Sequence, residues 1–249
     1  MTKIAIAFDF CGVLDIKDSY TINDPSLNFR VAKMADWQKC LRLFKLIDKY
    51  DLHFFCSSDY QKNIDVFQSI MLAVMDSQDE EAMAFVKGFR KGKGRKHKIR
   101  CRTDWPIKNA LLYHTVKDAS IDTVITLEDD ECIDAEYNPI YINGSNRMTD
   151  ENFRKLEDKI IMTILECDKL YACDKWDHQR ANHELWGNLD HKSRANLHGI
   201  EIYMVKSRIE KCEADNTCVP RVITALKRLQ ELHEAQLSLE QTKQVNHEE

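Results

Sequence analysis

Acidic and hydroxyl side chains come directly after three largely apolar runs of this 249-residue chain. Short apolar runs that end in polar residues are typical of the buried strands of a parallel sheet. The carboxyl ends of such strands meet at one edge of the sheet, where ligands bind. The runs and the polar residues after them are 4–8 with Asp9, 52–56 with Ser57-Ser58-Asp59, and 123–127 with Glu128-Asp129-Asp130-Glu131.

A shared sheet would bring Asp9 close to the acidic residues at 128–131, although Asp9 and Asp129 are 120 positions apart in the sequence. Carboxylates gathered in one place repel each other unless a positive charge lies between them. Carboxylate oxygens select hard cations, and Mg²⁺ typically binds one or two carboxylates together with a substrate phosphate. The pattern therefore indicates a site for a hard cation such as Mg²⁺.

The elements that must position these residues alternate along the first 150 residues, with apolar runs followed by longer helical patterns. This alternation predicts an α/β fold with a Rossmann-like parallel sheet covered by helices. Besides the three runs above, we expect a strand at 139–142, a weak strand at 99–101, and helices over 28–50, 64–74 and 106–116.

The C-terminal third of the chain has a different pattern. Thr149 is a good N-cap for a helix that reaches Leu170, residues 171–249 contain no strand-like run, and 219–239 is strongly helical. We therefore expect a sheet domain over 1–170 and a helical appendage over 171–249. Aromatic residues expected to pack the appendage onto the sheet domain are Trp176, Trp186 and Tyr203. An apolar stripe that favours a homo-oligomer comprises Ile223, Leu226, Leu229, Leu232 and Leu237.

Four segments occur in a fixed order over roughly residues 3–145. They are Phe8-Asp9-Phe10-Cys11-Gly12-Val13-Leu14-Asp15, Phe54-Phe55-Cys56-Ser57, Lys108 just inside a helix, and Val124-Ile125-Thr126-Leu127-Glu128-Asp129-Asp130. Together they resemble motifs I to IV of the haloacid dehalogenase (HAD) superfamily. The segment at 140–144 and the helix after Thr149 resemble, more loosely, HAD domains associated with polynucleotide repair.

The resemblance implies a Mg²⁺-dependent phosphohydrolase in which Asp9 attacks phosphorus and forms an aspartyl-phosphate. Ser57 would donate a hydrogen bond to a phosphoryl oxygen, and Lys108 would screen the charge between nucleophile and phosphate. Asp9 and Asp129 would bind the metal with Asp130 or Glu128. Ser58 remains an alternative to Ser57, and the sequence leaves open which acid of 128–131 meets the metal.

Cys11 departs from the family pattern, because phosphatases of this family have a second Asp at that position as general acid and base. A thiol with an ordinary pKa of about 8.5 is a poor substitute for such a carboxylic acid. Three interpretations stay open: a slow phosphatase with another base such as Asp15 or Asp59, a HAD-fold enzyme of altered chemistry, or a catalytically impaired module that binds phosphate or nucleic acid.

Basic residues are concentrated at 87–102, where nine of sixteen positions are Lys or Arg and none is acidic. Since the whole chain carries −5, the remainder carries −14. Three glycines (Gly88, Gly92 and Gly94) predict a flexible basic insert that contacts a phosphate-rich partner without sequence preference. Its central nucleic-acid-binding candidates are Lys91, Lys93, Arg95, Lys96, Lys98 and Arg100.

Composition limits the class of protein. Hydrophobic residues make up 43% of the chain, and no apolar run approaches the roughly 18 residues of a membrane span. The nine cysteines have neither zinc-site nor redox-motif spacing. We therefore expect a cytoplasmic protein with reduced cysteines, a phosphorylated substrate and no membrane partner.

Overall fold

The computed structural model describes residues 2–20, 33–58, 66–92, 98–99, 108–167, 189–215 and 219–248. The chain forms two compact units, one over Thr2–Ile160 and the other, apart from Met1, over Ile161–Glu249. The predicted boundary at 170–171 lies outside the described residues. Each unit is described separately below.

A four-stranded parallel sheet forms the centre of the first unit. Its strand order is β4 (His53–Cys56), β1 (Ile4–Phe8), β5 (Thr123–Glu128) and β6 (Pro139–Tyr141), and every neighbouring pair is parallel. All five residues of β1 are buried, as expected for a central strand with covering layers on both faces. The predicted α/β class with a parallel sheet is thus confirmed.

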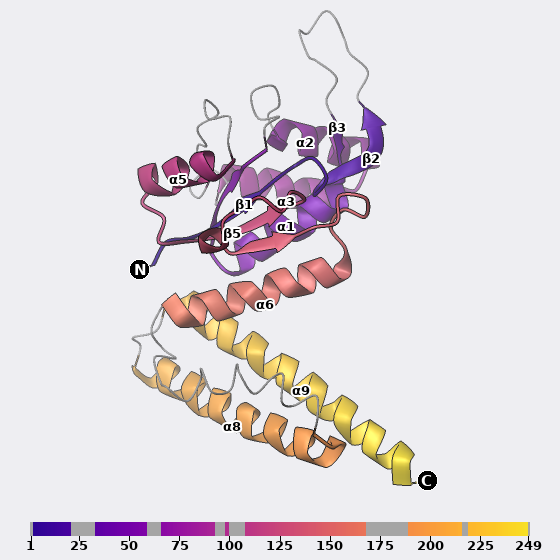
Figure 1. Ribbon diagram of the computed structural model, residues 1–249, viewed down its shortest axis with the longest axis vertical. Coiled ribbons are helices and arrows are strands. Elements are labelled where there is room, and N and C mark those ends of the chain that lie inside the picture. The colour runs from indigo at the N-terminus through magenta and orange to yellow at the C-terminus, as the bar shows by residue number, and fades with distance from the viewer. Residues whose placement is uncertain are drawn as a thin grey trace, which may run out of the picture. The chain divides into compact units, whose positions relative to one another are not determined.

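Helices cover both faces of this sheet (Figure 1). On one face, α5 (Lys108–Asp118) contributes Leu111 and Leu112 to a buried cluster with Ala7 and Phe55. On the other face, α1 (Trp37–Lys49) and α3 (Glu80–Lys91) pack their aromatic rings on β4. The ring centroids of this second cluster lie 5.1–5.7 Å apart, and the rings belong to Phe44, Phe54 and Phe89.

Two further helices extend the layer that contains α1. Helix α2 (Val66–Ser77) contacts α1 and α3, and α6 (Asp150–Cys167) begins beside α1. Thr149 caps α6 as predicted, since its hydroxyl oxygen accepts from the backbone N–H of Asn152 at 3.3 Å. A short 3₁₀ turn, η3 (Ala135–Tyr137), connects β5 to β6.

The region after β1 differs from the prediction. A helix was expected from residue 28, but Lys33–Ala35 form a strand, β3, which pairs with β2 (Asp15–Tyr20) in an antiparallel hairpin. Helix α1 begins only at Trp37, because the Asp36 side chain accepts from the backbone N–H of Lys39 and caps it there. Local capping thus sets the start of the helix, which the apolar spacing alone had placed too early.

The described part of the second unit contains two long helices that contact each other, α8 (His191–Asp215) and α9 (Pro220–Glu248). Leu226 of the predicted stripe is buried and its other members are partly buried. Tyr203 is 75% exposed, and its packing onto the sheet domain stays a prediction. Trp176 and Trp186 lie outside the described residues, and self-association stays a prediction.

The cysteines are not all reduced, contrary to expectation. Cys212 is disulfide-bonded, and its partner lies outside the described residues. The cysteines of the described part that are free are Cys11, Cys40, Cys56, Cys132 and Cys167. Among the helices that the structure describes, none is both long and apolar enough to cross a membrane.

Candidate phosphate and metal site

The strand register places Asp9, Ser57 and Glu128 in one row at the carboxyl ends of neighbouring strands. Phe8 of β1 is aligned with the last residue of β4 on one side and with Leu127 of β5 on the other. The ladder continues one step further, since Asp9 N donates to Leu127 O at 2.9 Å and Ser57 N donates to Phe8 O at 2.8 Å. Three segments that are distant in sequence therefore meet at one point.

Side-chain alternation assigns this row to one face of the sheet. Ala7 and Phe55 are each two residues before a member of the row, and both belong to the cluster that packs on α5. Because strand side chains alternate between faces with period two, Asp9 and Ser57 share the α5 face. Lys108 is the first residue of α5, so the helix begins beside the row.

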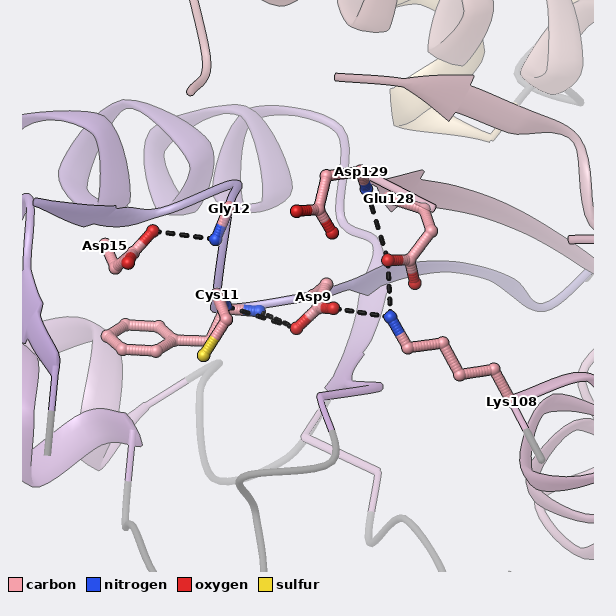
Figure 2. Close-up of polar contacts among 8 residues, drawn as sticks. Asp9, Cys11, Gly12, Asp15, Lys108, Glu128 and Asp129 are labelled. Carbon is pink, nitrogen blue, oxygen red and sulfur yellow. Dashed lines mark hydrogen bonds and ion pairs between the residues drawn. The ribbon is translucent and has the colours of Figure 1, made fainter. Parts of the chain in front are cut away.

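Asp9 is 4% exposed, and its carboxylate is held at both oxygens (Figure 2). Oδ1 accepts from the backbone N–H of Phe10 at 2.5 Å and of Cys11 at 3.2 Å. Oδ2 lies 2.6 Å from Nζ of Lys108. These contacts fix the orientation of the carboxylate before any ligand binds.

Lys108 bridges two carboxylates, because its Nζ also lies 2.5 Å from Oε1 of Glu128. Burial lowers the pKa of the Lys108 ammonium, but the charges and hydrogen bonds of Asp9 and Glu128 outweigh burial and raise it above its usual range. The lysine is therefore a permanent positive charge inside the acidic cluster.

Glu128 is fully buried at the end of β5. Burial, followed by the negative charge of Asp9, raises the pKa of the Glu128 carboxyl to about 8, although Lys108 opposes the shift. Its Oε2 is buried and has no hydrogen-bond partner in the described part of the chain. An orphaned carboxylate oxygen in this position lacks a cation or donor that it would bind when ionised.

Asp129 completes the acidic group and occupies a space that two glycines leave open. A Cβ on Gly12, whose φ is +77°, would lie 1.8 Å from Oδ2 of Asp129, and a Cβ on Gly144 would lie 2.8 Å from it. One oxygen each of Asp9, Glu128 and Asp129 lie within 4.8 Å of one another. These oxygens fit a hard divalent cation such as Mg²⁺.

Ser57 and Ser58 are both buried, and the hydroxyl oxygens of both lack a hydrogen-bond partner among the residues that the structure describes. A buried hydroxyl without a partner costs free energy unless a ligand or water satisfies it. Because successive residues point to opposite faces, Ser57 rather than Ser58 shares the face of Asp9.

Asp130 is exposed and lies apart from the acidic group formed by Asp9, Glu128 and Asp129. It interacts instead with Cys132, whose thiol pKa rises chiefly because of a hydrogen bond to Asp130. Within the described residues, Glu128 therefore takes the place that Asp130 was predicted to have. The strand register decides this, since Glu128 is the acid in the row of Asp9.

Cys11 is a partly exposed free thiol in the loop after β1. The alternative base Asp15 is fully buried, and Gly12 N donates to its Oδ1 at 2.8 Å. Arg147 also holds Asp15, with Nε 2.8 Å from Oδ1 and Nη2 donating to Oδ2 at 3.2 Å. Asp15 is therefore a structural carboxylate and not a free base, and the other alternative, Asp59, lies outside the described residues.

The sequence interpretation missed the ion pair between Asp15 and Arg147. It joins the loop after β1 to the loop after β6, and Met148 N reinforces it by donating to Val13 O at 3.1 Å. These two loops contain Gly12 and Gly144, which flank Asp129. The Asn143-Gly144 pair signals a turn after the last strand, but nothing in the sequence links Arg147 to Asp15.

The basic segment is partly helical and not a uniformly flexible insert, since α3 continues through Gly88 to Lys91. Lys98 is exposed and forms an isolated parallel bridge with Phe54. The other four candidates, which lie outside the described residues, are Lys93, Arg95, Lys96 and Arg100.

Comparison with known proteins adds no relative: no family model, no curated protein and no solved structure matches the chain. The interpretation of the site therefore depends on its residues and their geometry.

Replacing Arg147 tests whether the buried ion pair supports the site. Arg147→Met leaves the Asp15 carboxylate buried without its cation and should lower the free energy of unfolding by about 3–5 kcal/mol. Lys49→Met breaks a more exposed pair, in which Nζ lies 2.9 Å from Oε1 of Glu157, and should cost less than about 1 kcal/mol. Urea unfolding followed by circular dichroism measures both, and equal losses would contradict the assignment.

The raised pKa of Glu128 predicts a pH dependence of stability in the metal-free protein. The folded state keeps a proton on Glu128 up to about pH 8, whereas the unfolded state loses it near the ordinary glutamate pKa of 4.5. Stability should therefore fall as pH rises between these values, by up to about 1.4 kcal/mol per pH unit.

Glu128→Gln should remove this part of the slope, because the amide does not titrate. The measurement is urea unfolding in EDTA at several pH values. If the free energy of unfolding changed with pH in the same way for wild type and variant, the pKa of Glu128 would be ordinary.

Proposed function

We propose that the protein is a Mg²⁺-dependent phosphohydrolase of the HAD type that forms an aspartyl-phosphate at Asp9. The observation that carries the proposal is the row at the sheet edge with the lysine beside it, which together offer a fixed carboxylate, a partly buried ammonium and a buried hydroxyl without a partner among the described residues. Phosphoryl transfer needs positioning and charge stabilisation more than covalent chemistry from the protein, and this row can provide both.

Each of these three groups has a distinct task in this proposal. An oxygen of Asp9 forms a bond to phosphorus while the bond to the leaving oxygen breaks, and water later cleaves the aspartyl-phosphate to release phosphate. The Lys108 ammonium, already 2.6 Å from Asp9, offsets the repulsion between the nucleophile and the phosphate. The Ser57 hydroxyl, which has no partner of its own, would donate to a phosphoryl oxygen.

Asp9, Glu128 and Asp129 are the residues that would hold Mg²⁺ in this proposal, since their oxygens lie within 4.8 Å of one another. Bound there, the ion would neutralise charge on the phosphoryl oxygens. Gly12 and Gly144 keep the space that the Asp129 carboxylate occupies, and a side chain at Gly12 would displace it.

Proton transfer is the step for which the described residues offer least. The leaving oxygen needs a proton, and the attacking water must lose one, but Cys11 stands where the family has an acid. The buried Asp15 is committed to Arg147 and Gly12. A second candidate function follows from this: a module that binds a phosphorylated ligand at the same row with little or no turnover.

Asp9→Asn separates the two functions. The amide cannot attack phosphorus, so Mg²⁺-dependent release of phosphate from p-nitrophenyl phosphate should vanish, along with any acid-stable label at position 9 detected by mass spectrometry. Binding of inorganic phosphate should persist, because a negative charge facing the ligand is removed. Turnover that survives Asp9→Asn, or that EDTA leaves unchanged, would contradict the proposal.

Cys11→Asp tests the missing acid and base. If proton transfer limits a slow phosphatase, the variant should raise turnover by up to about 10²-fold, equivalent to about 2.7 kcal/mol of barrier. Cys167→Asp, at a cysteine on α6 outside the candidate site, is a matched control and should leave turnover unchanged. Slower turnover in Cys11→Asp would favour altered chemistry, and no turnover in either form with intact phosphate binding would favour the module.

A further inference from the structure

The exposed side of α3 carries three basic side chains near its C-terminal end, Lys87, Arg90 and Lys91. Within the described part of the chain, no carboxylate forms an ion pair with any of them. The lysines of α1 differ, since each lies within ion-pair distance of a carboxylate. Their distances are 3.1 Å for Lys39, 3.9 Å for Lys45 and 2.9 Å for Lys49.

These uncompensated cations belong to a chain whose net charge is −5. The 16-residue basic segment carries +9 and the rest of the chain carries −14, so a polyanion is repelled by most of the molecule. Long-range repulsion elsewhere and attraction here would direct a polyanion to this surface. This separation of charge therefore determines where a polyanion binds as well as how tightly it binds.

Both described ends of the basic segment lie at the β4 edge of the sheet. Helix α3 packs on β4 through the rings of Phe89 and Phe54, whose centroids are 5.7 Å apart. The chain returns to the same residue at Lys98, which bridges Phe54 in parallel, and Ile99 N donates to Phe54 O at 2.8 Å. Lys98 is exposed at this edge.

Helix α3 packs on the face of the sheet opposite Asp9, so a bound strand would pass around the β4 edge, at Lys98, to reach the phosphate site. Phe54 precedes Ser57 by three residues of the same extended segment, or about 10 Å along the strand. Asp9, which follows β1, is two strand spacings away from Lys98, or about 10 Å across the sheet. Phosphates along a nucleic acid strand repeat every 3.4 Å or so of helix axis, so a few of them span this distance.

We propose that the exposed cations of α3, with Lys98, form a binding surface for the sugar–phosphate backbone of a nucleic acid whose terminal phosphate enters the Asp9 site. The entry of the terminal phosphate into the Asp9 site rests on the proposed function, whereas the binding surface for the backbone does not. Lysine and arginine contacts to phosphates release condensed counterions, so the surface binds without sequence preference and with steep salt dependence.

The experiment compares two triple variants that remove equal charge. One is Lys87→Ala with Arg90→Ala and Lys91→Ala; the control is Lys39→Ala with Lys45→Ala and Lys49→Ala, which removes paired lysines. A fluorescent single-stranded oligonucleotide with a terminal phosphate is titrated in EDTA across a series of salt concentrations. Thermal unfolding checks that both variants fold.

The α3 variant should reduce the steepness of log affinity against log salt concentration by about 2, because each of the three lost phosphate contacts contributes roughly 0.7. The control should leave the slope unchanged. Equal slopes for wild type and the α3 variant, or no salt-dependent binding by wild type, would overturn the surface. A loss of slope in the control as large as in the α3 variant would overturn it too.

The terminal phosphate is tested with the same oligonucleotide lacking it. Removal should weaken binding and keep the slope, whereas equal affinity would overturn the link to the Asp9 site. A protein that binds with the predicted slope but releases no phosphate in Mg²⁺ would refute the proposed hydrolase and leave the surface standing. A Mg²⁺-dependent phosphatase with no change of slope would refute the surface alone.

Discussion

The register in which β1 pairs with β4 on one side and β5 on the other is the constraint on which the site depends. Because Phe8 is aligned with the last residue of β4 and with Leu127, the next position on each strand falls in a single row. A slip of one residue in either pairing would turn Ser57 or Glu128 to the opposite face. The buried apolar residues of these strands resist such a slip, so the core that stabilises the sheet also aligns the chemistry.

Charge is the second constraint. Asp9, Glu128 and Asp129 bring three carboxyl groups together, and Lys108 supplies one positive charge between two of them. Burial of Glu128 and the negative charge of Asp9 together outweigh the single ammonium, so Glu128 keeps its proton to an unusually high pH. A divalent cation at this place would offset the charge of the carboxylates.

The sequence predicted the strands of the sheet and the approach of Asp9, Ser57 and Lys108 to the acids after β5, because apolar runs and strand-end polarity are local signals. It could not choose between Glu128 and Asp130, since that choice depends on register between segments far apart in the chain. The hairpin of β2 and β3 was missed because its first strand, Asp15–Tyr20, has four polar residues among six and no apolar alternation typical of a strand. The Asp15–Arg147 pair was missed because a contact across 132 positions leaves no local pattern.

In the proposed function, the residues of the site fall into a part that would hold phosphate and a part that would move protons, and only the first is complete among the described residues. Lys108 and the Ser57 hydroxyl need no proton transfer to bind or orient a phosphoryl group. A thiol at position 11 leaves this binding part intact, because the position contributes its backbone N–H to Asp9 whatever its side chain. Attack by Asp9 on an ester with a good leaving group would therefore be less affected by Cys11 than hydrolysis of the aspartyl-phosphate, for which water must lose a proton. In that case the phosphorylated form of the protein would persist, and the lifetime of that form, more than the rate of its formation, is what distinguishes an enzyme from a phosphate-binding module here.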